Sequence, residues 1–75
     1  MTRTVKVGRM GRPSIDVELN ENLSYTYAEV VDLAGFSVDG KVRSEEGTIT
    51  DMDKEVPLMV KNVMLQAPKI DGGQI

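Results

Sequence analysis

The sequence contains no cysteine and no histidine among its 75 residues. The absence of cysteine excludes a disulfide scaffold, a thiolate zinc site and a cysteine nucleophile. The absence of histidine removes the commonest general base and the commonest metal ligand. We therefore expect a protein that is not an enzyme and that holds neither a metal nor a cofactor. A chain without cysteine also fits a reducing compartment, so we expect cytoplasmic localisation.

Aromatic residues and long apolar runs are also scarce. The chain has two tyrosines, one phenylalanine and no tryptophan, and its formal net charge is −3. An acidic chain with so few aromatics is a poor candidate for binding nucleic acid. No apolar run approaches the roughly 20 residues that span a bilayer, and the N-terminus has no signal-peptide core. We expect protein partners, and neither nucleic acid nor a membrane.

What remains is the composition of a small globular protein. The chain is 40% apolar and 28% charged, and its length predicts one domain. A domain of this size buries only about 60% of the surface of its unfolded chain, which leaves little room for a deep active-site cavity.

Charge is distributed unevenly along the chain. Residues 1–15 contain four bases and no acid, namely Arg3, Lys6, Arg9 and Arg12. Residues 16–75 contain all 12 acids and five bases, which gives a net charge of −7. The basic segment is either a docking surface for an acidic partner or a set of bases that offset nearby acids within a sheet.

The first 20 residues predict two strands. Residues 2–10 place Val5 and Val7 on one face, and residues 15–20 alternate apolar and polar side chains throughout. Glycine and proline within residues 11–14 are typical of a turn. Two such strands joined by a short turn predict an antiparallel hairpin.

A short helix follows. Thr26 and Glu29 have the spacing of a capping box, and Gly35 is placed to end the helix. One apolar stripe has the spacing of a helix face: Tyr27, Val30, Val31 and Ala34.

Beyond the helix the signals are weaker. Asp39-Gly40 predicts the turn of a second hairpin, formed by residues 36–38 and 41–43. Residues 44–55 are acidic and predict a loop with one short strand or turn. Residues 63–67 are nearly all apolar and predict a final strand in the middle of a sheet.

This order of elements predicts an α+β fold in which one helix packs across a mixed sheet of four to five strands. The first and final strands pair in parallel at the centre, because the helix crossover lies between them. We expect a single domain over residues 1–70 and a flexible tail over residues 71–75.

The same order, with a closing Gly72-Gly73, resembles the β-grasp family, which includes ubiquitin-like proteins and the small sulfur carriers of thiamine and molybdopterin biosynthesis. The resemblance lies in residues 5–9, 15–19, 26–35, 38–41, 57–58 and 63–73. It implies the β-grasp fold and a C-terminal carboxylate that an adenylating enzyme activates, to carry sulfur or to form an amide with a lysine.

By this resemblance Gly72 and Gly73 are the working residues, because a narrow tunnel admits only backbone without side chains. Met64, Leu65 and the exposed face of the sheet would dock the activating enzyme. Three bases of the first strand complete the predicted partner surface: Arg3, Lys6 and Arg9.

Two residues, Gln74 and Ile75, follow the glycines, so carrier chemistry requires that they be removed. The alternative is a non-catalytic interaction or structural module, such as a component of a virion or another assembly, with a tail that is merely flexible. Such a module would bind through the sheet surface or through an exposed edge strand.

The acids of residues 44–55 do not have the pattern of a calcium site. Calcium loops need a defined order of ligands with a glycine turn and a terminal glutamate, and Glu45-Glu46 with Asp51 and Asp53 lack that order. We expect a solvated loop there.

Overall fold

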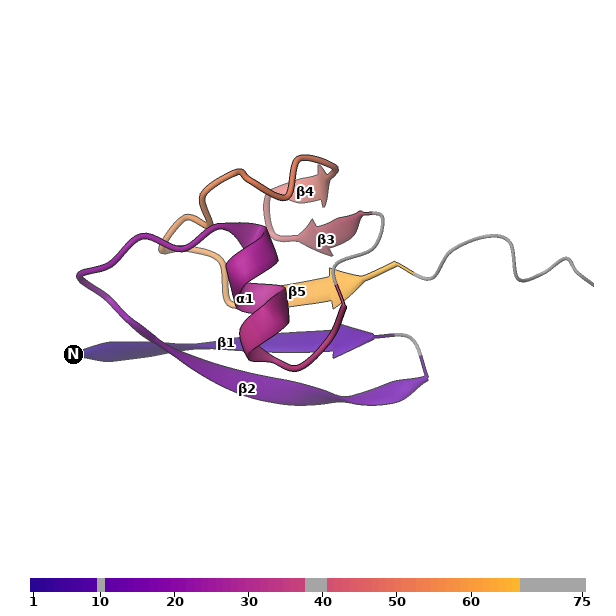
Figure 1. Cartoon of the computed structure of the whole chain (residues 1–75), viewed down its shortest axis with the longest axis horizontal. Coiled ribbons are helices and arrows are strands. Elements are labelled where there is room, and N and C mark those ends of the chain that lie inside the picture. Colours follow the sequence, from indigo (N-terminus) through magenta and orange to yellow (C-terminus); the bar gives the residue numbers. More distant parts are fainter. Residues whose placement is uncertain (10, 38–40, 67–75) are drawn as a thin grey trace, which may run out of the picture.

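The computed structural model describes residues 1–9, 11–37 and 41–66 (Figure 1). Within them the chain forms five strands and one helix: β1 (Thr2–Arg9), β2 (Arg12–Asn20), α1 (Tyr27–Leu33), β3 (Val42–Ser44), β4 (Gly47–Ile49) and β5 (Asn62–Leu65). The strands form one sheet in the order β2-β1-β5-β3-β4. The predicted α+β class, with one helix and a mixed sheet of five strands, is confirmed.

The predicted β1–β2 hairpin is confirmed. The two strands pair antiparallel as far as Val7 and Ile15, and a bulge then shifts the register so that Arg9 faces Arg12. The connection turns through Gly11, whose φ of +83° lies in the left-handed region that side chains disfavour. The hairpin therefore closes where the sequence places its glycine.

The parallel pairing of the first and last strands is also confirmed. β5 lies beside β1 with Lys6 opposite Asn62 at one end and Arg9 opposite Leu65 at the other. Parallel neighbours need a long crossover connection, and the segment that contains α1 provides it. β5 thus occupies the middle of the sheet, between β1 and β3 (Figure 1).

The second hairpin differs from the prediction. Phe36 and Ser37 belong to no strand, and the Asp39-Gly40 turn lies outside the described residues. β3 instead pairs with β4 around Glu45-Glu46, and β4 is the one short strand in a segment otherwise predicted to be a loop. Tertiary pairing explains the difference. One edge of β3 pairs with β5, so the other edge of β3 pairs with the residues that follow it in the chain. Phe36 packs against the core.

The helix begins and ends where the sequence predicts. The Thr26 hydroxyl accepts a hydrogen bond from the Glu29 N–H at 3.2 Å, and the Glu29 carboxylate accepts one from the Thr26 N–H at 2.8 Å. This reciprocal pair satisfies two backbone donors that the first turn would otherwise leave without partners. Gly35 follows the C-cap with a φ of +86°, as expected for a residue that ends a helix.

The helix covers one face of the sheet only. Its predicted stripe is buried: Tyr27, Val30 and Val31 have no exposed surface, and Ala34 is 6% exposed. The stripe packs on a single core to which every strand contributes: Val5, Val7, Val17, Leu19, Val42, Ile49, Val63 and Leu65, with Val56 and Val60 from the segment before β5. The side chains that alternate with these strand residues point to the opposite, uncovered face.

The capping box gives a direct test of how the helix is held. Thr26→Ala removes the side-chain acceptor for the Glu29 N–H, and we expect it to lower the free energy of unfolding by about 1 kcal/mol. Urea denaturation monitored by circular dichroism measures the change. Thr50→Ala, at an exposed position outside the helix and strands, is the matched control. An equal loss in both variants would contradict the capping role.

Candidate functional site

The face of the sheet opposite the helix, here called the open face, presents exposed side chains to solvent. Its side chains come from all five strands: Thr4, Lys6, Asp16, Glu18, Asn62, Met64, Arg43 and Thr48. All of these residues are exposed, and Met64 is a large apolar side chain that remains 45% exposed. The face therefore has an apolar centre within a polar surround.

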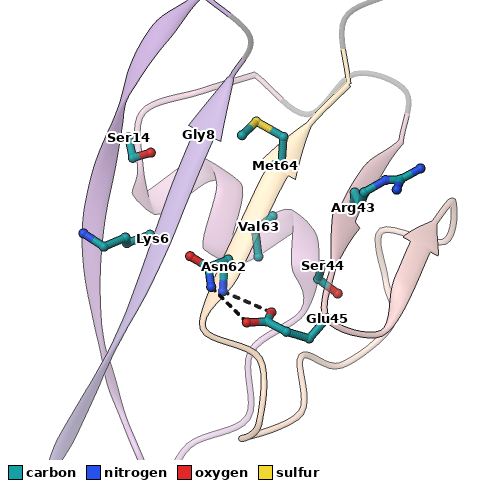
Figure 2. A pocket seen from close by; sticks show the side chains of 9 residues that line it. All are labelled: Lys6, Gly8, Ser14, Arg43, Ser44, Glu45, Asn62, Val63 and Met64. Atoms are coloured by element: carbon teal, nitrogen blue, oxygen red, sulfur yellow. Dashed lines mark hydrogen bonds between the residues drawn. The ribbon is translucent and has the colours of Figure 1, made fainter.

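A hollow of about 310 Å³ lies on the open face (Figure 2). It is lined by Lys6, Gly8, Ser14, Arg43, Ser44, Glu45, Asn62, Val63 and Met64. Gly8 keeps it open, because a Cβ there would lie 3.0 Å from the Ser14 hydroxyl and 3.4 Å from the Met64 methyl group. The lining residues come from β1, β2, β3, β5 and the β3–β4 turn, so the hollow exists only in the assembled sheet.

Glu45 occupies one end of this hollow. Its carboxylate accepts hydrogen bonds from the Lys61 N–H at 3.2 Å, from the Asn62 N–H at 3.1 Å and from the Asn62 side-chain amide at 3.0 Å. Figure 2 shows the contacts with Asn62. The Asn62 side-chain amide, followed by the backbone donors, holds the pKa of Glu45 below its usual value, because hydrogen bonds to the ionised form favour it. The carboxylate thereby joins the β3–β4 turn to the start of β5.

Two cations line the same hollow. Lys6 pairs with Asp16 at 3.2 Å, but both side chains are more than half exposed, so the pair contributes little to stability and exchanges readily with solvent. Arg43 comes from the other side of β5 and is exposed. The hollow thus combines Met64, two bases and one carboxylate that is already hydrogen-bonded.

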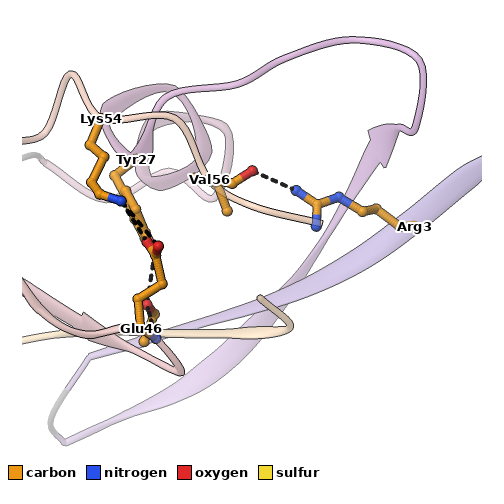
Figure 3. A network of polar contacts seen from close by, with 6 residues as sticks. Arg3, Tyr27, Glu46, Lys54 and Val56 are labelled. Atoms are coloured by element: carbon orange, nitrogen blue, oxygen red, sulfur yellow. Dashed lines mark hydrogen bonds and ion pairs between the residues drawn. The ribbon is translucent and has the colours of Figure 1, made fainter. Parts of the chain in front are cut away.

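A second polar network lies behind the turn, on the side of the helix (Figure 3). The buried Tyr27 hydroxyl donates to the Glu46 carboxylate at 2.8 Å and lies 2.8 Å from the Ser44 hydroxyl. Because a phenol has one proton, the Ser44 hydroxyl is the donor in the second contact. Lys54 pairs with Glu46 at 3.0 Å, and the Glu46 N–H donates to Ser44.

The network shifts the ionisation of both acids in it. Burial raises the pKa of Tyr27 to about 12, since ionisation would place a phenolate in the core. The Tyr27 hydrogen bond and then Lys54 hold the pKa of Glu46 below its usual value. The side chains of the two neighbouring glutamates point to opposite faces of the sheet: Glu46 faces the helix, and Glu45 faces the hollow.

The predicted partner surface divides between the two faces of the sheet. Lys6 and Met64 lie on the open face, as expected. The placement of Leu65 on an exposed surface was wrong, because Leu65 is 4% exposed and belongs to the core. Consecutive residues of a strand point to opposite faces, so Met64 and Leu65 cannot both line one surface.

Arg3 and Arg9 are not part of the open face either. Both alternate with Lys6, and both are half-buried. The Arg3 guanidinium donates to the carbonyl oxygens of Pro57 at 2.9 Å, Val60 at 3.3 Å and Val56 at 3.4 Å, so it holds the loop before β5. Figure 3 shows the contact with Val56. The first strand is therefore no continuous basic surface. Gly72 and Gly73 lie outside the described residues.

Sequence reasoning missed the residues that complete the hollow. Arg43, Glu45 and Asn62 reach it because β3, its turn and β5 are neighbours, and the acidic segment gave no strand signal strong enough to reveal that pairing. Gly8 had a signal, since it alternates with Val7 and so shares the side of Lys6.

Comparison with known proteins gives no relative: no protein-family model, no curated protein and no solved structure matches the chain. In the part of the chain that the structure describes, no helix is long and apolar enough to cross a membrane. Within the same residues, no three acidic side chains gather in a group that could hold a metal ion.

The Tyr27 network has a testable titration. The pKa of Tyr27 rises from 10.0 to about 12 on folding, so its contribution to stability is present below pH 10 and is lost as the pH rises through about 12. Tyrosinate absorbance should show one late-titrating tyrosine in the folded protein. Tyr27→Phe should abolish that late transition; its persistence in this variant would contradict the assignment.

Proposed function

We propose that this chain is a ubiquitin-like protein of the β-grasp class that acts by being bound, and that a partner protein recognises the open face of its sheet. Support for the class comes from the strand order β2-β1-β5-β3-β4, the parallel β1–β5 pair and the single helix across one face. In this proposal the chain performs no catalysis of its own.

The observation that carries the proposal is the make-up of the hollow. Met64 is an apolar anchor, and Lys6 and Arg43 flank it on neighbouring strands. An apolar centre with a polar rim is the usual anatomy of a protein–protein interface, and methionine adapts well to a partner's shape. The apolar stripe of the helix is not available to a partner, because its residues already form the core.

The C-terminal Gly72-Gly73 relates binding at the open face to carrier chemistry. β5 is the central strand, and the sequence after it leads to Gly72-Gly73. A partner seated on the open face would therefore hold the strand from which the tail begins. We propose an adenylating enzyme as that partner and the Gly73 carboxylate, after removal of Gln74 and Ile75, as the group it activates.

A second candidate function is favoured by Gln74 and Ile75 themselves, which follow the glycines in the sequence. If they are retained, the chain is an interaction or assembly module that uses the same open face without carrier chemistry. The two functions share a surface and differ only in the chemistry of the tail.

The open face is tested by one charge-introducing substitution and its matched control. Met64→Glu places a carboxylate at the centre of the hollow, and we expect the amount of partner captured from cells that produce the protein to fall at least about tenfold, as for a central interface residue. Leu58→Glu introduces the same change at an exposed loop residue and should leave capture intact. The reverse pattern would refute recognition by this face.

The tail is tested separately by mass. Carrier chemistry predicts an intact mass ending at Gly73, and a further species with sulfur or a conjugate on that residue. Deletion of residues 71–75 should abolish the modified species and leave capture through the open face in place. If every molecule from native cells retains Gln74 and Ile75, the carrier function is wrong and the interaction module remains.

A further inference from the structure

The backbone donors at the start of β5 form a site that would bind any carboxylate. The N–H groups of Lys61 and Asn62 and the Asn62 side-chain amide converge on one point, which the Glu45 carboxylate occupies at 3.0 to 3.2 Å. Successive backbone N–H groups with a side-chain donor make a concavity that suits an anion, and bonds to an ionised acceptor are the stronger kind. These donors recognise carboxylate oxygens, and nothing in them is specific to Glu45.

The Glu45 carboxylate can also be released from these donors. It is an exposed residue of a two-residue turn, so its side chain can rotate into solvent without disturbing the core. Glu46 keeps the turn in place when Glu45 moves, because its carboxylate binds Tyr27 and Lys54 on the other side of the sheet. Its N–H also donates to the Ser44 hydroxyl. The Glu45 contact is exposed to solvent, so the interaction that an incoming carboxylate must displace is weak.

The surroundings favour an incoming acid. Lys6 and Arg43 line the same hollow, so the departure of the Glu45 carboxylate leaves two cations beside the vacated donors. Met64 provides an apolar surface between them. The chemistry that fits is an acidic side chain next to an apolar one on an extended segment of a partner protein.

We propose that the Lys61 and Asn62 amides form a carboxylate-binding site that Glu45 fills from within the chain, and that an acidic side chain of the partner takes over this site on docking. The proposal rests on the proposed function, since it assigns a chemistry to the partner that binds the open face. The proposal predicts the direction of a change in affinity. Removal of the acidic residue from the hollow should strengthen the binding of an acidic ligand by more than removal of an acid elsewhere.

The test uses the whole chain and defined probes. Glu45→Ala vacates the donors, and titration with sodium acetate should move the Lys61 and Asn62 amide signals saturably in an NMR spectrum. A capped hexaglutamate peptide should bind Glu45→Ala about fivefold more tightly than the original protein, the order expected when one like charge at contact distance is removed from an exposed site. Glu18→Ala removes the same charge from the open face outside the hollow and is the control.

Glu45→Gln is the second variant, because it retains one carbonyl oxygen for the amide donors if Glu45→Ala does not fold. Affinity for the peptide should then rise from the original protein to Glu45→Gln, and Lys6→Gln with Arg43→Gln should lower it. No saturable response at the Lys61 and Asn62 amides, or an equal gain in Glu18→Ala, would overturn the site. Those outcomes leave the Met64→Glu capture result untouched, so the two proposals fail separately.

Discussion

The parallel pairing of β1 with β5 determines where the rest of the structure lies. It places the last described strand at the centre of the sheet, with the β1–β2 hairpin on one side and the β3–β4 hairpin on the other. The described residues form one helix and five strands, and the stripe of that helix from Tyr27 to Ala34 packs on one face of the sheet. The opposite face remains in water, so it carries polar residues on every strand and Met64 at its centre. The open face is thus a direct consequence of the topology.

The edges of the sheet offer a partner much less. β2 is one margin, and there a bulge interrupts the register, Pro13 removes a backbone donor, and Asp16 and Glu18 place like charges along the strand. The Asn20 N–H is already bound by the Tyr25 hydroxyl. Bulges, proline and charge are the features by which proteins prevent strands from adding at an edge. The other margin, β4, has only three residues. Among the described strands, recognition through a face therefore suits the molecule better than strand addition.

Local signals were sufficient where neighbouring residues decide the structure. The alternation of residues 15–20, the Thr26–Glu29 capping box and the turn at Gly11 each depend on short-range chemistry, and each was predicted correctly. The β3–β4 hairpin was missed because three-residue strands are held by registration against β5 and carry almost no periodicity of their own. The sequence predicts Arg3 as a surface base, and this prediction is wrong for a related reason. Its guanidinium binds three carbonyl oxygens of a loop more than 50 residues away, which sequence spacing cannot reveal.

Glu45 and Glu46 show how one turn can serve both faces of a sheet. A two-residue turn sends consecutive side chains in different directions, so one carboxylate reaches Tyr27 and Lys54 behind the sheet while the other reaches the amides of Lys61 and Asn62 in front. Loss of Glu46 would destabilise the fold, because the buried Tyr27 hydroxyl would lose its acceptor and an unpaired hydroxyl in the core is costly. The exposed amides have no such constraint, since water or another carboxylate can replace Glu45. The same acidic pair thus contains a fixed contact that shapes the hollow and an exchangeable one that fills it, and only the exchangeable contact is suited to regulate what binds there.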